Sequence, residues 1–277
     1  MKFKSIFILF NLTLVFVTGI VSLLPFFMLG SSFTESFWRI NWPLILLLIV
    51  LFAGFNVFYF INRKLFLLLE KEDWPALVRY LEDRVIQKGN YSPRLVRLLA
   101  NCYLVLSDSA AVMSLENKVA IAKPALVDEN ALVFGTARIL GKDISGAVRF
   151  FDVRKKTVKA GLGEWVHWYH GFALLLDRQY EDAAAAFSVL AKEAKDGIVT
   201  GLSSYFLYQN ISQALPTKKH EFGEIAALGA DRVRKALPGF AKWNRERSRL
   251  STEIYAAALS KYMEDSCQWL YAAGRNS

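Results

Sequence analysis

The stretch FYFINRKLFLLLEKEDWPALVRYLEDRV, residues 58–85, decides the fold, because the most apolar part of the chain runs through it into a charged segment. Neither Gly nor Pro lies between Phe58 and Asp73, and apolar residues keep a helical spacing past Arg63 and Lys64. The pattern predicts one helix that leaves an apolar segment and directly begins a soluble, helical part of the chain.

Two long apolar segments lie in the first quarter of the chain, where residues 5–34 and 40–62 contain no charged side chain. A helix needs about 20 apolar residues to cross a hydrocarbon core of roughly 30 Å, since it rises about 1.5 Å per residue. The segments therefore predict membrane-spanning helices at about Ser5–Leu29 and Asn41–Asn62. Pro43 can start the second helix, where its missing N–H is not required.

A cleaved signal peptide is the alternative interpretation of the first apolar segment, because Lys2 and Lys4 precede it. The apolar core of a signal peptide is only about 7–15 residues long and ends at a small-residue cleavage site. Here the run continues through VSLLPFFML, residues 21–29, so we favour a retained span. A lipid-anchored lipoprotein is not expected, because no cysteine lies near the N-terminus.

The flanking positive charges predict the orientation of the hairpin, since short loops rich in Lys and Arg stay in the cytoplasm. The segment between the spans offers only Arg39, whereas the charges outside the spans are Lys2, Lys4, Arg63, Lys64 and Lys71. We therefore expect a cell (inner) membrane protein with two spans, a lipid bilayer as one partner, and both termini in the cytoplasm.

An internal period follows the apolar segments. Aligning EDWPALVRYL, SDSAAVMSLE, KDISGAVRFF and RQYEDAAAAF gives columns that are spaced 35, 35 and 36 residues apart. These columns are Trp74, Ser109, Ile144 and Tyr180; then Leu77, Val112, Ala147 and Ala183; and then Leu81, Glu116, Phe151 and Phe187. A further column of Ala100, Gly135 and Gly171 places a small residue where two helices would approach closely. Repeated units with helical spacing predict a stack of helices.

The pattern resembles the tetratricopeptide repeat (TPR), a helix-turn-helix unit of about 34 residues with Gly in its first helix and A-x3-F in its second. The best copy, residues 164–190, matches at Gly171, Leu174, Tyr180, Ala183 and Phe187, and residues 129–151 match at Gly135, Ala147 and Phe151. Two other copies are degenerate, with Glu116 in place of one aromatic residue, and none has the Pro that usually ends the unit. The resemblance covers roughly residues 60–200.

The resemblance implies an all-α fold in which a two-helix transmembrane hairpin is followed by a TPR-like α-solenoid. We expect three parts: the hairpin at 1–62, the repeats at 63–200, and a C-terminal helical extension at 201–277 that caps the array. The first helix of the first unit would be the cytoplasmic end of the second span. Asp73 would cap the next helix, and Pro75 would lie in its first turn.

Proteins with such repeats resemble one another in using a concave surface, lined by the first helix of each unit, to hold peptides or partner helices. The binding residues implied here are Arg94, Arg97, Asn101, Leu132, Thr136, Trp165, Trp168 and Phe172. The segment RLLANCY, residues 97–103, resembles half of a carboxylate-gripping pattern, but Trp165 and Tyr169 stand where that pattern has cations. The alternatives are a solvated face, or coverage of the aromatic strip by the C-terminal helices.

A basic run lies between residues 229 and 250, where seven cations and two acidic residues give +5 of the net +9 of the chain. Such a run favours anionic lipid or an acidic protein partner, although a solvated helical face is the simpler alternative. No nucleic-acid motif accompanies it, so no nucleic-acid partner is expected. The cations are Arg232, Arg234, Lys235, Lys242, Arg245, Arg247 and Arg249.

Little in the sequence favours catalysis. Glu164 and His167 match the Glu-x-x-His spacing of di-iron bundles, with His170 one turn further, but a second such motif is absent. Cys102 and Cys267 are too few for a metal cage and are expected to be buried. We therefore expect no catalytic residues, no metal and no cofactor.

The sequence thus predicts a membrane-anchored scaffold that binds protein partners not yet identified. The layout also resembles bacterial two-span, repeat-tailed (HemY-like) proteins associated with protohaem biosynthesis. That resemblance implies an accessory protein of a membrane-associated biosynthetic pathway as the alternative, and a metal-dependent enzyme is the third reading.

Overall fold

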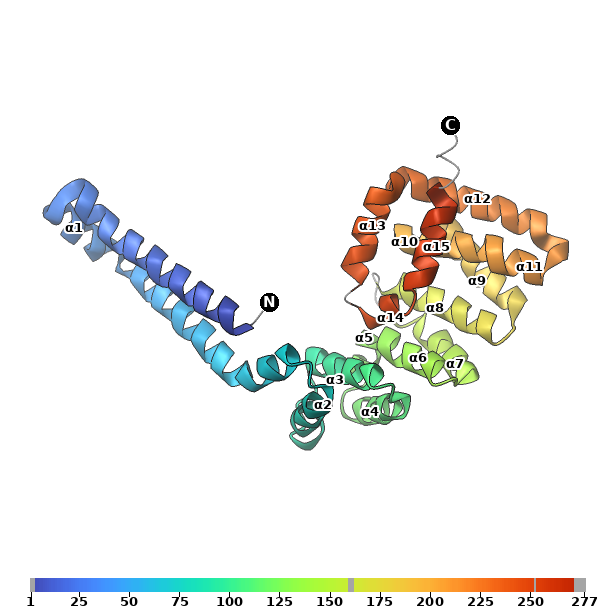
Figure 1. Cartoon of the computed structure of the whole chain (residues 1–277), viewed down its shortest axis with the longest axis horizontal. Helices are drawn as coiled ribbons and strands as arrows, with labels where there is room; N and C mark the ends of the chain where they lie inside the picture. The colour runs from blue at the N-terminus through green and yellow to red at the C-terminus, as the bar shows by residue number, and fades with distance from the viewer. Residues whose placement is uncertain (1–2, 159–161, 252, 272–277) are drawn as a thin grey trace. The chain divides into compact units, whose positions relative to one another are not determined.

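The computed structural model describes residues 3–158, 162–251 and 253–271, and every regular element in these ranges is a helix (Figure 1). The all-α class expected from the sequence is confirmed. The chain divides into two compact units, Met1–Tyr80 and Leu81–Ser277.

The first unit is dominated by α1 (Phe3–Glu70), whose backbone leaves the helical conformation at Gly30 and Asn41. It contains two segments long and apolar enough to cross a membrane, Phe3–Met28 and Thr34–Glu70. The second segment begins seven residues before the predicted Asn41, but its backbone deviates at that residue. Pro43 accounts for the deviation, because a proline cannot donate the hydrogen bond that the preceding turn would accept.

The two arms of α1 lie side by side, as Figure 1 shows in blue and cyan. Phe7 stacks on Tyr59 with ring centroids 3.7 Å apart, and Phe10 contacts Phe55 at 3.9 Å. The Asn56 side-chain amide also donates a hydrogen bond of 2.8 Å to Asn11 Oδ1. A polar contact of this kind joins helices in an apolar environment, where an unpaired amide would be costly.

The helix passes Arg63 and Lys64 without a break and ends at Glu70. The continuous helix predicted for residues 58–70 is therefore confirmed. The structure has no discontinuity at the expected boundary after residue 62, and the first compact unit extends to Tyr80. The expected boundary after residue 200 also falls inside a helix, because α10 covers Gly197–Phe206.

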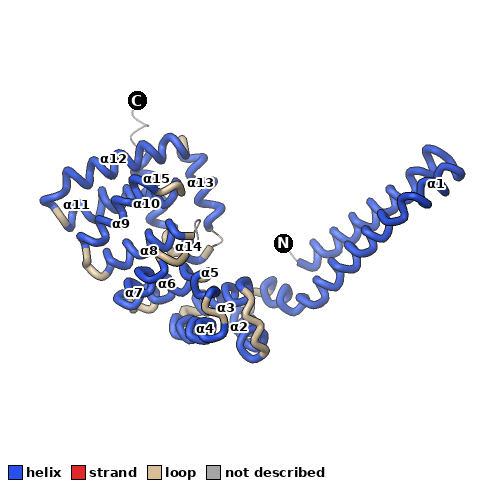
Figure 2. Tube along the Cα trace, turned by 180° about the vertical axis from the view of Figure 1, so that it is seen from behind, coloured by secondary structure: helices blue, strands red, loops and turns tan. Residues whose placement is uncertain are grey.

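The remaining elements are helices much shorter than α1 (Figure 2). They are α2 (Trp74–Glu82), the π-helical turn η1 (Asp83–Gln87), α3 (Pro93–Val105), α4 (Ser109–Ala122), α5 (Ala125–Glu129), α6 (Ala131–Leu140), α7 (Ile144–Arg154), α8 (Gly163–Leu176), α9 (Tyr180–Glu193), α10 (Gly197–Phe206), η2 (Leu207–Ile211), α11 (Ser212–Ala214), η3 (Pro216–Lys218), α12 (Lys219–Ala236), α13 (Gly239–Leu250), α14 (Ile254–Ala257) and α15 (Ser260–Tyr271).

Four connections share one backbone geometry. Glu72, Ser107, Lys142 and Arg178 all have positive φ, between 53° and 63°, and they are spaced 35, 35 and 36 residues apart. After each of them, the next amide donates to the carbonyl five residues earlier, as in a Schellman motif. These bonds are Asp73 N to Leu68 O, Asp108 N to Tyr103 O, Asp143 N to Arg138 O and Gln179 N to Leu174 O.

The residue after the positive-φ position also starts the next helix. Asp73, Asp108 and Asp143 each accept a hydrogen bond from the backbone amide three residues later, as N-cap residues do. Asp73 therefore caps α2 as expected, while Gln179 makes no side-chain cap at the fourth turn. The period found in the sequence thus corresponds to a recurring helix-turn-helix backbone.

Small residues permit close contact between the helices of each pair. A Cβ atom on Gly135 of α6 would lie 2.0 Å from the Phe151 ring of α7, and one on Gly171 of α8 would lie 3.1 Å from Phe187 of α9. The predicted close approach is confirmed at Gly135 and Gly171 of this column. In the degenerate copy, Glu116 of α4 is buried and forms an ion pair with Arg138 of α6 in place of an aromatic contact.

Candidate functional site

The inner face predicted for partner binding is largely buried. Leu132 and Thr136 of α6 and Trp165, Trp168 and Phe172 of α8 are all at most 8% exposed. Their cover comes from the C-terminal part of the chain, since Tyr255 packs on Trp165 at 5.4 Å and Tyr262 contacts Phe172 at 6.0 Å between ring centroids. Of the alternatives left open by the sequence, coverage of the aromatic strip by C-terminal helices is the one observed, and a binding role for these five residues stays a prediction.

The polar end of that face lies on α3. Arg97 bonds to Asn130 Oδ1 at 3.4 Å and to the Glu129 carbonyl at 3.3 Å, so its guanidinium is engaged within the chain. Arg94 is exposed and Asn101 is partly buried. The half-pattern for gripping a carboxylate is therefore not assembled as an open basic site.

The basic run separates into two sets of side chains. Arg232 donates to the Ala191 and Ala194 carbonyls, both at 2.7 Å, at the C-terminal end of α9. Arg234 donates to the Leu270 carbonyl of α15 at 2.9 Å. Both arginines therefore satisfy carbonyls at helix ends, which is a structural role. The other five are on the surface to differing degrees: Arg247 is partly buried, and Lys235, Lys242, Arg245 and Arg249 are exposed.

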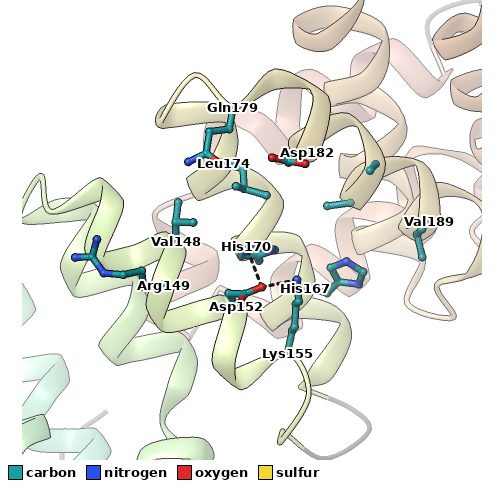
Figure 3. A pocket seen from close by; sticks show the side chains of 12 residues that line it. Val148, Arg149, Asp152, Lys155, His167, His170, Leu174, Gln179, Asp182 and Val189 are labelled. Atoms are coloured by element: carbon teal, nitrogen blue, oxygen red, sulfur yellow. Dashed lines mark ion pairs between the residues drawn. The ribbon is translucent and has the colours of Figure 1, made fainter.

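A groove of about 520 Å³ opens between α7, α8 and α9 and is the candidate site (Figure 3). We call it the α7–α9 groove. Helix α8 provides its floor, while α7 and α9 are the second helices of two successive pairs and form its walls. Its lining is Val148, Arg149, Asp152 and Lys155 from α7 and the residue after it; His167, His170 and Leu174 from α8; and Gln179, Asp182, Ala185, Ala186 and Val189 from α9 and the residue before it.

Charged side chains of both signs converge in this groove. Asp152 Oδ1 lies 2.7 Å from Lys155 Nζ and 3.7 Å from His170 Nε2, and Figure 3 shows both contacts of the carboxylate as dashed lines. The Lys155 ammonium, through its hydrogen bond, lowers the pKa of the Asp152 carboxyl. Asp152 is thus held as an anion that faces the groove.

The two histidines of the groove are held in the neutral form. Burial, with Lys155 nearby, lowers the pKa of His170 to about 4, and it lowers the pKa of His167 as well. His170 Nδ1 is buried and has no hydrogen-bond partner among the described residues. A neutral imidazole can donate a hydrogen bond to a bound group or accept one from it. The histidines beside the Asp152–Lys155 pair could therefore help to bind a ligand.

The geometry does not support Glu164, His167 and His170 as ligands of one metal ion. Both Glu164 carboxylate oxygens accept 2.9 Å hydrogen bonds, from the Lys195 and Asp196 amides between α9 and α10. Within the described ranges, no group of three or more His, Cys, Asp and Glu residues could hold a metal ion. Cys102 and Cys267 are buried and free, and burial raises the pKa of both thiols.

Sequence reasoning singled out the histidines but missed Asp152, Lys155 and Asp182. The helical spacing of residues 149, 152 and 155 places them on one side of α7, and residues 182, 185, 186 and 189 share one side of α9. The period could have suggested that equivalent faces of two second helices flank α8. The predicted binding residues all lie on the first helix of a pair, and those helices form the face that is covered.

Comparisons with known proteins place the chain in a family. The profile of a family described as "Uncharacterised Treponema protein" matches residues 111–272, which include most of α4 and all helices from α5 to α15. An "Uncharacterized protein" of Treponema pallidum (strain Nichols) is 28% identical over 280 residues, covering 98% of this chain and 88% of the relative. No solved structure matches the chain. Because the family match spans more than half of the chain, the protein belongs to this Treponema family.

Proposed function

We propose that the protein is a membrane-anchored scaffold whose helical pairs bind a partner protein. The recurrence of one helix-turn-helix geometry at spacings of 35, 35 and 36 residues is the observation that carries this proposal. Repeated pairs of this kind form extended surfaces suited to holding other proteins, and the spacing favours a TPR-like array. The two apolar segments of α1 supply the anchor.

The α7–α9 groove is the surface proposed to contact the partner. Its lining combines apolar side chains, among them Leu174 and Ala186, with the charged side chains of Arg149, Lys155 and Asp182. Charges of both signs beside apolar side chains favour a protein segment over a small apolar ligand. None of the twelve lining residues carries a hydroxyl or thiol nucleophile, so binding is proposed in place of catalysis.

Site-specific photo-crosslinking in cells tests this function. A photo-reactive residue at Ala185, which is exposed in the groove, is expected to capture a discrete protein. The charge reversal Lys155→Glu should reduce that capture at least several-fold, because it removes the cation next to Asp152. Ile121 of α4, which is 87% exposed and outside the groove, is the matched control position. The same products from both positions, or capture insensitive to Lys155→Glu, would contradict the proposal.

The array is proposed to face the cytoplasm, because positive charges flank the two spans and are scarce between them. A cysteine at Glu35, between the spans, should react with a membrane-impermeant maleimide added to spheroplasts. A cysteine at Lys192, which is on the surface of α9, should react only after the membrane is permeabilised. Both substitutions would be made with Cys102 and Cys267 replaced by alanine. Labelling of the Lys192 position in intact spheroplasts would reverse the proposed orientation.

A further inference from the structure

The segment Glu253–Leu259, which contains α14, occupies the face formed by α6 and α8. Tyr255, Ala256 and Leu259 are each at most 6% exposed, whereas Ala257 and Ala258 on its other side are exposed. One side of the segment therefore rests on the repeat helices and the other faces solvent. We call this segment the plug.

The plug makes specific contacts with α8. The Tyr169 hydroxyl donates a hydrogen bond to the Tyr255 carbonyl, and the Tyr255 ring packs edge-on against Trp165 and Tyr169. Helix α14 also packs on α6. The contact thus combines a backbone acceptor with an aromatic side chain inserted among aromatic residues, which is how a protein surface holds a bound peptide segment.

The plug is weakly held compared with the helices on either side. Helix α14 has four residues and no side-chain cap, and a single turn is not stable on its own. In contrast, α15 is tied to α12 and α13, since Arg234 donates to the Leu270 carbonyl and the Trp243 indole donates to the Met263 carbonyl. The plug could therefore leave the face while α13 and α15 remain in place.

The fit of the plug is incomplete. A cavity of about 50 Å³ remains beside Tyr255, lined in part by Arg97 and Asn130. The unfilled space beside the Tyr255 side chain leaves room for an occupant that fits better.

We propose that the plug is an internal occupant of a peptide-binding face and exchanges with a segment of a partner protein that has the same chemistry. That segment presents a tyrosine or phenylalanine in the place of Tyr255, an alanine-sized residue next to it, and a leucine four positions after the aromatic residue. The repeat helices recognise the aromatic ring and the carbonyl beside it. The partner and the plug compete for one face, so the protein is closed until such a segment displaces its own.

A peptide of residues 251–260, STEIYAAALS, labelled with a fluorophore, is the probe for this exchange. It would be added to the full chain in detergent and to two opened variants: Tyr255→Ala, and a chain with residues 253–259 replaced by seven Gly and Ser residues. We expect at least tenfold tighter binding to both opened variants than to the unchanged protein. The same peptide with alanine in place of its tyrosine should lose that binding.

Two results would overturn the proposal. The first is an opened variant that keeps its helical content but binds the peptide no better than the unchanged protein does. The second applies even if the opened variants fail to fold: amide hydrogen exchange of the unchanged chain should be at least a hundredfold faster in the plug than in α15, and equal rates would exclude exchange of the plug. Neither result depends on the α7–α9 groove, whose partner is tested separately.

Discussion

At the scale of single residues, Gly135 and Phe151 show how the pattern of small and aromatic residues acts. The Phe151 ring is fully buried, stacks on Tyr169 with centroids 5.6 Å apart, and occupies the space that a side chain at residue 135 would need. The sequence could predict this pair because both residues recur one period later as Gly171 and Phe187. A pairwise contact that repeats is visible in one sequence, whereas a unique contact is not.

The substitution Gly135→Ala should therefore destabilise the protein. The added methyl would lie 2.0 Å from the ring, and overpacking of this kind costs about 1–3 kcal/mol. Gly223→Ala in α12 is the matched control, since no atom lies within 4 Å of its added Cβ, and it should raise stability by up to about 1 kcal/mol. Chemical denaturation in detergent measures both, and equal effects of the two would contradict the packing argument.

His170 makes stability depend on pH. Its pKa is about 4 in the folded protein, because burial disfavours the charged ring, against 6.5 in the unfolded chain. Between these values the unfolded chain binds a proton that the folded chain does not, so the free energy of unfolding falls as the pH falls from about 6.5 to 4. The loss should be about 3 kcal/mol and should level off below pH 4.

The variant His170→Gln should remove that part of the pH dependence in equilibrium denaturation series. The neighbours that face the ring are Lys155, Asp152, His167 and Asp182, and all would be kept. His220→Gln is the control, because the His220 side chain is 92% exposed and should leave the pH profile unchanged. An unchanged profile in His170→Gln would show that His170 is not the group responsible.

At the scale of elements, the four Schellman turns set the length of each helical pair. In each turn, the residue at positive φ ends the preceding helix. These residues are Glu72, Ser107, Lys142 and Arg178, and none of them is the glycine usually found at positive φ. The sequence predicted where the second helices begin through the aligned columns, and it predicted the Asp73 cap of α2; the caps at Asp108 and Asp143 were found only in the structure. It did not predict the left-handed residues, because their identities carry no glycine or asparagine signal.

Replacing Lys142 by glycine should stabilise the protein. A non-glycine residue in the left-handed region costs about 1 kcal/mol, and glycine removes that cost while loosening the unfolded chain. We expect a net gain of up to about 1 kcal/mol in the free energy of unfolding. Ser188→Gly, inside α9, is the control and should instead lose about 0.5 kcal/mol or more, because glycine disfavours helix interiors. A loss at residue 142 would contradict the turn assignment.

At the scale of the whole molecule, the hairpin and the helical unit follow different rules of burial. The apolar residues of α1 are largely exposed, whereas those of the second compact unit, Leu81–Ser277, are largely buried. Composition alone predicted that contrast. Coverage of the inner face could not be predicted in the same way, because residues 86 positions apart, such as Tyr169 and Tyr255, are joined by a contact that has no period.

Exposure of the two apolar segments predicts firm membrane attachment. The protein should stay in the membrane fraction after an alkaline carbonate wash and should be released by detergent, because roughly 20 apolar residues per span favour the hydrocarbon core. The variant Ile49→Arg should weaken insertion, at a cost of about 2.5–3.5 kcal/mol at the centre of a span. Fractionation and immunoblotting measure both, and release by carbonate alone would contradict a spanning hairpin.

The unbroken helix from Trp42 to Glu70 would also act as a lever arm. It is about 42 Å long at 1.5 Å per residue, and no glycine kink or proline interrupts it beyond its first turn. A tilt of its apolar part by about 10° would therefore swing Glu70, at the entry to the first Schellman turn, through about 7 Å. A change in bilayer thickness that alters the tilt would thus move that turn directly, without binding of a ligand.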